Sequence, residues 1–380
     1  MAETLLNKKQ ILSEEWQKPS SWVDLRSGAL PNSVYLLAAH SADYSTYPTL
    51  TVYAEVSDSS TYDVYVDGIK KYSAVSSGTA TTLSWGTVAT GYDVDYPSEF
   101  RTNIVRITPT DSTKTITRIN NQAGDATVMT GVLWAHFTTV NYMNLRLAFK
   151  NLTHLEAVTA KDDTLNVLDL SNVFDGCSEL KTVPTFDGNS NYNYRDAQAA
   201  FSGCVKLQKI SFENFCTYRA CSHMFNNCSA LKKISTKNSV IKMWNSTFNG
   251  CAKLESLPDL ANGSANAMDG LLSACTSLKE TVLDLSGEAS LTKLSIGATA
   301  SKRVDGLKGV IVSPSAPFSA SPFVDVSYTG LERAALVALF DSLPTVSDSQ
   351  VCTVTGCAGA ADLTQDDMTV ATAKGWTVTR

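Results

Sequence analysis

The heptapeptide Phe201-Ser-Gly-Cys-Val-Lys-Leu207 decides the fold, because its pattern recurs through the middle of the chain. Five more segments carry a large apolar residue, then a Cys or Leu three positions later, and then a Leu three positions after that. They are Phe149-Lys-Asn-Leu-Thr-His-Leu155, Phe174-Asp-Gly-Cys-Ser-Glu-Leu180, Phe225-Asn-Asn-Cys-Ser-Ala-Leu231, Phe248-Asn-Gly-Cys-Ala-Lys-Leu254 and Leu272-Ser-Ala-Cys-Thr-Ser-Leu278. Successive copies begin 25, 27, 24, 23 and 24 residues apart. A period of this length indicates a solenoid, in which each copy forms one coil and buries its apolar face against its neighbours.

Each copy is followed by a short alternating run that predicts one strand per coil. In Leu207-Gln-Lys-Ile-Ser-Phe212 and Leu231-Lys-Lys-Ile-Ser-Thr236, apolar residues alternate with polar ones. Alternate residues of a strand point to opposite faces, so the apolar residues are expected to face inward. The outward positions are then Lys209, Ser211, Lys233 and Ser235.

The Phe and Cys of each copy are expected to form the core of the solenoid. They lie three positions apart on a turn or short helix, so both side chains can point to the same interior. The expected core residues are Phe174, Cys177, Phe201, Cys204, Phe225, Cys228, Phe248, Cys251 and Cys275. Zinc ligands come in pairs about two to four residues apart, whereas these thiols fall on different coils, so we interpret them as packing residues. Two local pairs, Cys216 with Cys221 and Cys352 with Cys357, leave disulfide bonds open.

The Phe-x-x-Cys-x-x-Leu unit resembles the BspA-type leucine-rich repeats found on bacterial surface proteins and in structural proteins of gut bacteriophages and prophages. The resemblance covers about residues 143–380 and includes the C-terminal segments 307–313, 326–330 and 374–378. It implies a solenoid with a structural or binding role, and homo-oligomers of the kind that fibres form. Arrays on bacterial proteins are usually long, regular and preceded by an export signal, whereas this array is short and irregular.

The C-terminal segment has the features of a helical cap for the solenoid. Apolar residues recur at helical spacing over residues 331–343. Thr364 followed by Gln-Asp-Asp predicts the start of a second helix, because Thr is a good N-cap and acids favour the first turn. Asp366 and Asp367 are therefore interpreted as capping residues rather than as an acid/base pair. Gly375 predicts the end of this helix, with a last strand after it.

The N-terminal region predicts a small all-β sandwich. Short β-prone runs occupy residues 50–56, 62–66, 69–73, 81–84 and 104–108. Asp67-Gly68 predicts a type I′ hairpin, since both residues tolerate positive φ. Trp22-Val-Asp-Leu-Arg26 resembles the opening of modules that precede such repeats in phage-encoded proteins. The predicted division is an N-terminal helical arm at 1–19, the β-sandwich at 20–120, a linker and N-terminal cap at 121–144, the leucine-rich-repeat-like solenoid at 145–313, and C-terminal repeats with a cap at 314–380.

Leu5, Leu12 and Trp16 are spaced to share one face of the N-terminal arm. Two roles are open for this face. It can anchor the protein by docking on a partner subunit, or it can pack on the sandwich of its own chain.

Composition and motifs argue against several functional classes. The net charge of −6 disfavours nucleic acid as the main partner, because phosphate binding draws on clustered Lys and Arg. No apolar run is long enough for a membrane span, and the N-terminus lacks the pattern of a secretory signal. No phosphate loop, metal motif or nucleophile elbow occurs, and the four histidines are scattered. We therefore expect no enzyme activity, no metal and no cofactor.

The candidate ligand surface is the outward strand row with its adjoining loops. Its members are Tyr192, Tyr194, Lys209, Ser211, Lys233, Ser235, Trp244 and Ser256. Residues 145–285 hold 14 basic and 14 acidic side chains, so we expect aromatic stacking and neutral hydrogen bonds instead of attraction to a polyanion. The expected partners are a host-surface glycan or protein and other virion proteins.

The expected function is that of a bacteriophage virion structural protein on a head or tail appendage, located at the virion surface. A secreted or cell-surface bacterial adhesin is the alternative. A polysaccharide depolymerase is the third possibility, because a pair of catalytic carboxylates need not be adjacent in the sequence.

Overall fold

The computed structural model describes most of the chain, and its contacts divide it into two compact units. The described residues are 16–20, 22–41, 49–84, 92–93, 100–119, 131–139, 141–188, 196–215, 221–239, 241–242, 245–258, 260–261, 267–321 and 323–380. Unit 1 comprises Met1–Asn144, Asn151–Asn166 and Ser178–Thr185. Unit 2 comprises Leu145–Lys150, Val167–Cys177 and Phe186–Arg380.

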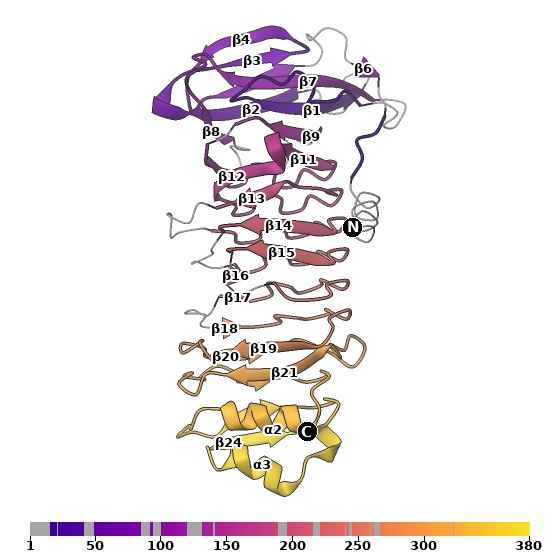
Figure 1. The fold of residues 1–380 in the computed structure, drawn as a ribbon, viewed down its shortest axis with the longest axis vertical. Helices are drawn as coiled ribbons and strands as arrows, with labels where there is room; N and C mark the ends of the chain where they lie inside the picture. The colour runs from indigo at the N-terminus through magenta and orange to yellow at the C-terminus, as the bar shows by residue number, and fades with distance from the viewer. Residues whose placement is uncertain are drawn as a thin grey trace, which may run out of the picture. The chain divides into compact units, whose positions relative to one another are not determined.

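Unit 1 is built of strands (Figure 1). One of its sheets runs in the order β11-β9-β1-β7-β3-β4, and β6 also pairs with β7. Elsewhere in the unit the strands β10, β8, β2 and β5 are neighbours in that order. The bounds are β1 Val34–Ser41, β2 Thr49–Val56, β3 Tyr62–Val66, β4 Ile69–Val75, β5 Ala80–Ser84, β6 Tyr92–Asp93, β7 Phe100–Pro109, β8 Ile116–Ile119, β9 Val132–Phe137, β10 Met143–Asn144 and β11 Ala157–Ala160. Two short 3-10 helices, Ser57–Ser59 and Lys161–Asp163, lie between strands.

The predicted hairpin is confirmed. Only two residues, Asp67 with φ 47° and Gly68 with φ 79°, separate β3 from β4, and both have the positive φ of a type I′ turn. The Asp67 carboxylate also accepts the backbone N–H of Ile104 at 2.9 Å, which ties the turn to β7. All five predicted β-prone runs lie within strands of the unit. The sandwich packing of those strands stays a prediction.

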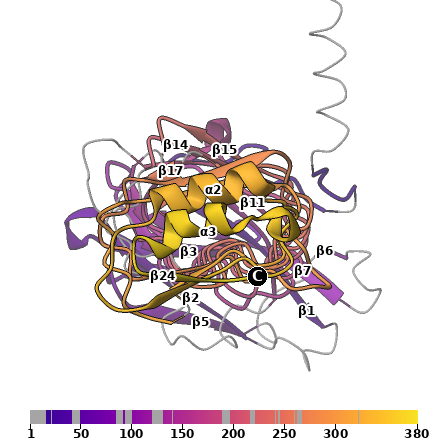
Figure 2. The same cartoon turned by 90° about the horizontal axis from the view of Figure 1, so that it is seen from below.

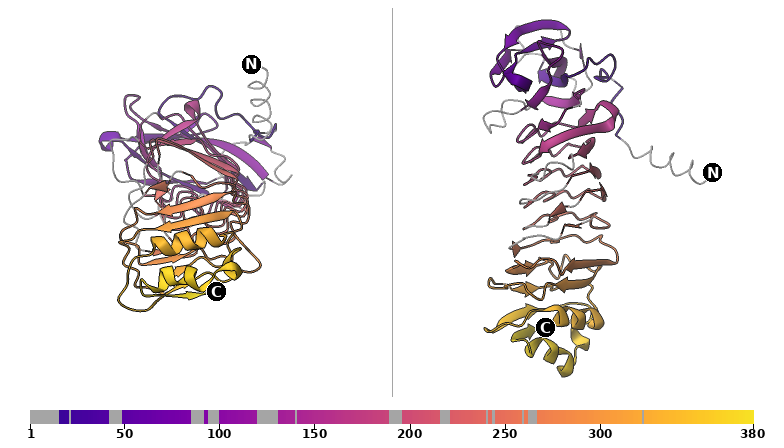
Figure 3. Two further views of the ribbon diagram at one scale, coloured as in Figure 1. Left: turned by 60° about the horizontal axis from the view of Figure 1, so that its bottom comes forward. Right: turned by 60° about the vertical axis from the view of Figure 1, so that its left-hand side comes forward.

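Most of the repeats lie in unit 2, whereas residues 151–155 and 178–180 of the first two copies belong to unit 1. The described part of the chain forms a β-solenoid of about nine turns. The strands of neighbouring coils pair in parallel, as Lys209↔Lys233 and Ser211↔Ser235 do, and the views in Figures 1 and 3 show the coils of this unit stacked one upon another. Two strands, β12 Thr164–Asp169 and β13 Thr185–Asp187, contain residues of both units. The later strands are β14 Lys209–Glu213, β15 Lys233–Lys237, β16 Ile241–Lys242, β17 Leu260–Ala261, β18 Ala267–Met268, β19 Thr281–Leu285, β20 Lys293–Ser295, β21 Leu307–Val312, β22 Val324–Asp325, β23 Gln350–Thr353 and β24 Trp376–Thr379.

Both predicted C-terminal helices are present, namely α2 (Arg333–Ser342) and α3 (Gln365–Thr372). Figure 2 shows them side by side, and α2 also packs beside β21. Thr364 caps α3 as predicted: its hydroxyl accepts the N–H of Asp367, while the Asp367 carboxylate accepts the N–H of Thr364 at 2.8 Å. A 3-10 helix, Ala360–Asp362, precedes α3. In the part of the chain that the structure describes, no helix is long and apolar enough to cross a membrane. A capping role for the helix pair stays a prediction.

Three glycines of unit 2 mark places where neighbouring coils approach each other with no room for a side chain. A Cβ added at Gly306 would overlap the carbonyl oxygen of Leu278, and one added at Gly330 would overlap that of Asp305. A Cβ at Gly359 would overlap the backbone N of Arg333. At these positions glycine is therefore required because the backbones of two coils are in contact, and not because a turn needs positive φ.

Gly306→Ala should destabilise the protein by about 2–3 kcal/mol, because the coils must move apart to admit a methyl group. Gly309→Ala is the matched control, since the added Cβ would meet only the side-chain carbons of the exposed Val282, at 3.2 Å or more, and should cost below about 1 kcal/mol. Urea unfolding of both variants measures the difference. Equal midpoints for the two variants would show that the coils are not packed as closely as described.

Candidate binding surface

The turn explains why four of the repeats contain Gly or Asn just before Cys, whereas in the sixth copy Ala274 takes this position with φ 60°. This position has positive φ in successive coils: Gly176 81°, Gly203 76°, Asn227 61° and Gly250 80°. Glycine adopts this left-handed conformation without strain, and Asn tolerates it best among the other residues. The residue two before each Phe is also left-handed, at Asn172, Ala199, His223 and Ser246. The two left-handed residues bracket the Phe and bend the chain around it.

Backbone hydrogen bonds join each turn to the next coil. The N–H of Phe174 donates to the carbonyl of Ala200 at 2.8 Å, and the N–H of Phe201 donates to that of Met224 at 2.8 Å. The N–H of Phe225 continues the series to Thr247 at 2.9 Å. Because these groups are buried, each bond avoids the cost of an unsatisfied donor.

The phenylalanines stack directly upon one another inside unit 2. Ring centroids lie 5.5 Å apart for Phe149 and Phe174, 5.4 Å for Phe174 and Phe201, and 5.7 Å for both Phe201 with Phe225 and Phe225 with Phe248. All five side chains are fully buried. Such aromatic pairs stabilise a core beyond the simple burial of area, so the predicted Phe column is confirmed.

The cysteines form a second column with a hydrogen-bonding role. Each Sγ–H donates to the carbonyl of the Phe one coil earlier, at 3.0–3.2 Å. The pairs are Cys177 with Phe149, Cys204 with Phe174, Cys228 with Phe201, Cys251 with Phe225, and Cys275 with Phe248. The Phe carbonyl also accepts the N–H of the Cys in its own turn, as Phe174 does from Cys177 at 3.0 Å. Cys fits because it is small, apolar and a weak donor.

Burial keeps these thiols protonated. It raises the pKa of Cys275 to about 12 and raises the pKa values of Cys204, Cys228 and Cys251 well above the ordinary range. Among the described residues no cluster of His, Cys, Asp and Glu could hold a metal ion. Cys352 and Cys357, the pair for which a disulfide was left open, are separate buried thiols in the structure. Cys216 lies outside the described residues, so the question of a disulfide between Cys216 and Cys221 stays open.

The predicted outward row is only partly present. Lys209 and Ser211 lie on β14, directly beside Lys233 and Ser235 on β15. Both lysines are exposed and both serines are half-buried. Ser256 is exposed as expected, but it lies in a bend and not on a strand, because Pro258 two residues later has no N–H to give to a strand ladder. Tyr192, Tyr194 and Trp244 lie outside the described residues.

Ion pairs connect neighbouring coils along the surface of unit 2. Glu255 pairs with Lys279 at 2.7 Å, Asp269 with Lys293 at 2.7 Å, and Lys150 with Asp175 at 3.0 Å. Lys237 and Glu213 form a further pair between β15 and β14. Each exposed pair adds little stability, about 0–1 kcal/mol, so these contacts support a stack whose main stability lies inside.

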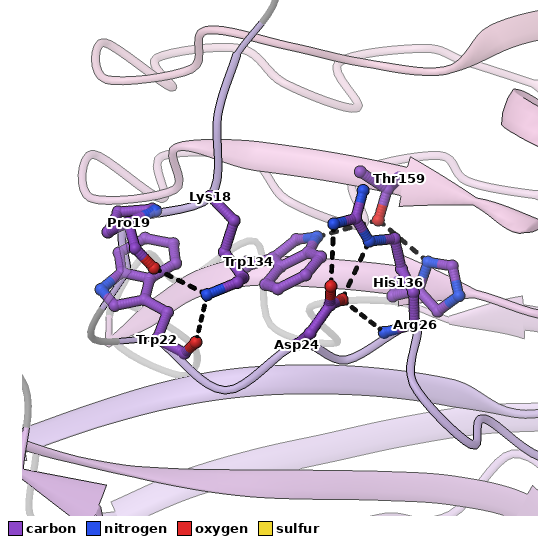
Figure 4. A network of polar contacts seen from close by, with 8 residues as sticks. All are labelled: Lys18, Pro19, Trp22, Asp24, Arg26, Trp134, His136 and Thr159. Carbon is purple, nitrogen blue, oxygen red and sulfur yellow. Dashed lines mark hydrogen bonds and ion pairs between the residues drawn. The ribbon is translucent and has the colours of Figure 1, made fainter.

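In unit 1, described residues from 16–20 and 22–26 pack around the buried Trp134, and Figure 4 shows part of this cluster. The guanidinium of Arg26 lies 5.7 Å from the centre of the Trp134 ring. It is held in this position because it donates two hydrogen bonds, of 2.8 and 2.9 Å, to the Asp24 carboxylate. On the inner side, Trp134 Nε1 donates to the Thr159 hydroxyl at 2.8 Å, and His136 Nδ1 lies 2.9 Å from the same oxygen. Burial, aided by the charge of Arg26, lowers the pKa of His136. This network therefore holds a neutral imidazole in a packing role.

Trp16 belongs to the same cluster. Its ring lies 5.5 Å from that of Trp134 and 6.4 Å from that of Trp22. The proposed anchoring role of Trp16 is therefore replaced by the alternative, packing on its own unit. Leu5 and Leu12 lie outside the described residues.

Together, the Phe and Cys columns and the parallel strands that pair between coils define a repeat β-solenoid. Residues 145–279 match the family described as BspA type Leucine rich repeat region, in six copies. The six copies agree in number with the six heptapeptides, and the match indicates a surface or adhesin-type repeat protein. No curated protein and no solved structure matches the chain.

Two features were not predicted from the sequence. The first is the left-handed backbone of the turns: Gly or Asn before most of the repeat cysteines is a signal for it, but the residue types of Ala199 and Ser246 do not indicate positive φ. The second is the contact of Arg26 with Trp134, which no local sequence pattern predicts because the two residues are more than 100 positions apart.

The eight described cysteines should be unreactive in the native protein. A Cys216→Ser variant, which leaves those eight thiols, should react with a thiol reagent only slowly at neutral pH and completely in denaturant, because burial disfavours the thiolate. Spectrophotometric counting of reacted thiols measures this. Several thiols that react rapidly without denaturant would contradict the stacked Cys column.

Asp24 should contribute a small, pH-dependent stability. The hydrogen bonds from Arg26 lower its pKa from 3.8 to about 2, so the contribution is complete above pH 3.8 and is lost as the pH falls through about 2. With allowance for solvent, Asp24→Asn should cost below about 1 kcal/mol near neutral pH, and the difference from wild type should vanish at the acid end. Unfolding measured from pH 5 to pH 2 tests this.

Asp58→Asn is the control for that series, because Asp58 is also ion-paired, with Lys114 at 2.7 Å, but its side chain is 75% exposed. Asp58→Asn should lower the free energy of unfolding by less than Asp24→Asn does. An Asp24→Asn effect that stays constant down to pH 2 would reject the assigned role of the Arg26 hydrogen bonds.

Proposed function

We propose that this protein is a non-catalytic structural protein of a bacteriophage virion, carried on a head or tail appendage. Its solenoid is displayed for contact with the host surface or with other virion subunits. The observation that carries the proposal is the repeat stack, in which Phe, Cys and backbone groups are all used to join coils. Outward side chains of such a stack can serve binding without disturbing the core.

Several described groups that could act in catalysis have structural contacts instead, and this supports a non-catalytic role. Five repeat thiols donate to Phe carbonyls. Asp367 caps α3 and binds Arg333 at 2.8 Å. His136 lies buried beside Thr159 and Trp134. The Thr159 hydroxyl does lie beside the His136 imidazole, but its oxygen also accepts the Trp134 N–H, and His136 and Trp134 are buried, so we interpret this pair as part of the packing of that cluster.

A bacterial cell-surface adhesin is the second candidate. The match of residues 145–279 to BspA-type repeats favours it, because such proteins are typically surface-exposed or extracellular. Both candidates place the same solenoid outside a cell and differ in what carries it.

Analysis of purified particles separates the two candidates. Mass spectrometry of gradient-purified virions from the source should find the chain in fixed proportion to the coat proteins, with an abundant cytosolic protein as the control for contamination. If the chain is absent from particles and is cleaved by protease added to intact cells, the adhesin is correct instead.

We propose further that the N-terminal region anchors the protein. Because Trp16 is packed in its own unit, the arm that remains for a partner is residues 1–15. Deleting those residues should abolish incorporation into virions and leave thermal unfolding unchanged, whereas normal incorporation would reject the anchoring role.

A further inference from the structure

A row of four side chains crosses one sheet of unit 1 and alternates between aromatic and cationic groups. Arg106 on β7 is the direct partner of Tyr35 on β1 on one side and of Tyr65 on β3 on the other. Tyr65 in turn is the direct partner of Lys70 on β4. Residues directly opposite each other point to the same face of a sheet, so these four side chains are neighbours. The strands β1, β7, β3 and β4 follow one another in this order, as Figure 1 also shows.

One end of this row is buried and the other end is accessible. Tyr35 is 8% exposed and belongs to the cluster around Trp134, and its hydroxyl accepts the N–H of Leu30 at 2.8 Å. Arg106 and Tyr65 are half-buried, and Lys70 is exposed. The row therefore passes from the core of unit 1 to a surface that a ligand can reach.

The Tyr65 ring holds the guanidinium of Arg106 in place. The central carbon of the guanidinium lies 3.8 Å from the ring centroid, which is a close cation–π contact. The Nζ of Lys70 lies 5.4 Å from the centroid of the same ring. One aromatic ring thus lies beside two cations, so the accessible part of the row is a positively charged site with a fixed arginine.

Arg106 differs from Lys70 in having no acidic partner among the described residues. The carboxylate of Asp63 binds Lys70 at 2.6 Å. The same carboxylate also accepts the N–H of Ala74 at 2.8 Å and the hydroxyl of Thr110 at 3.0 Å, so its oxygens are already used. The Nε of Arg106 is buried without a hydrogen-bond acceptor. A buried N–H in this state is costly because it has lost its water, and an acceptor supplied by a ligand would remove that cost.

Hydroxyl groups lie on the same face beside the arginine. Thr108 follows Arg106 by two positions on β7, so both side chains point to one face of the sheet. Its Oγ1 lies 3.0 Å from the Oγ of Ser33. Tyr65 contributes a third hydroxyl group. A guanidinium surrounded by neutral hydroxyls matches a small ligand that carries one carboxylate and several hydroxyl groups.

We propose that this face of unit 1 binds an acidic sugar, whose carboxylate is bound by Arg106 and whose hydroxyl groups meet those of Tyr65 and Thr108. A guanidinium can donate two parallel hydrogen bonds to a carboxylate, which distinguishes an acidic sugar from its neutral counterpart. Nucleic acid fits less well, because phosphate binding draws on several cations and the net charge of −6 opposes it. The site goes beyond the proposed function, since it lies on β3 and β7 and not on the repeats.

The test titrates the full-length protein with methyl glucuronide and methyl galacturonide, followed by ligand-observed NMR. Methyl glucoside and methyl galactoside are the comparison, because they have the same rings without the carboxylate. The wild type should bind at least one of the acidic sugars about tenfold or more tightly than its neutral counterpart, since only the acidic sugar forms charge-assisted hydrogen bonds.

Arg106→Gln should weaken the binding of that acidic sugar by about tenfold or more. Arg106→Lys keeps the charge but loses the forked donors, so it should bind more weakly than the wild type and more tightly than Arg106→Gln. Thermal unfolding of both variants verifies that each is folded at the temperature of the titration.

Arg118→Gln is the matched control, because it removes the same charge from a strand of the same unit. The Nε of Arg118 is also buried without an acceptor, but its Nη1 donates to Glu55 at 3.1 Å, so this guanidinium already has an acidic partner. The variant should change the affinity for the acidic sugar about twofold at most. Equal losses in Arg118→Gln and Arg106→Gln, or no loss in Arg106→Gln, would overturn the proposal.

Three other outcomes would also overturn it, and each has a distinct meaning. Equal binding of the acidic and neutral sugars would reject the role of the guanidinium. Binding of N-acetylglutamate as tight as that of the acidic sugars, with the same loss in Arg106→Gln, would assign the site to an acidic side chain of a partner protein. No saturable binding of either acidic sugar would reject the site. Failure of the proposed function is a separate result, read from the particles.

Discussion

The structure depends on the carbonyl of the repeat Phe, which receives two hydrogen bonds from two different coils. Its own turn supplies the N–H of Cys, and the next coil supplies the Sγ–H of another Cys. Both bonds require the turn to be tight, which is why left-handed residues stand two positions before and after the Phe. A buried carbonyl that accepts two hydrogen bonds avoids the cost of an unsatisfied acceptor, so one turn can pack directly on the next.

This constraint separates the interior of the solenoid from its surface. Phe, Cys and Leu positions are fixed by the stack, and glycines such as Gly306 and Gly330 are fixed by backbone contact between coils. The outward positions carry no such restriction, so charge can be placed on them coil by coil.

The sequence predicted what periodicity and turn chemistry determine. The strand at 62–66, the turn at Asp67-Gly68 and the N-cap at Thr364 were all found because their signals are local. The role of Arg26 over Trp134 was not, because the two residues meet only through the tertiary fold. The candidate surface was predicted in part: Lys209 and Lys233 lie where alternation placed them, whereas Pro258 keeps Ser256 off a strand.

The central claim is that neighbouring coils are joined through the turns that carry Phe and Cys. Native-state amide hydrogen exchange tests this most directly, because it reads the N–H groups of Phe174, Phe201 and Phe225 one by one. These amides should exchange only through cooperative unfolding of the stack, with the slowest rates in its middle coils. Exchange of these amides at the rate of exposed turns, while the strand amides of β14 and β15 stay protected, would contradict the account.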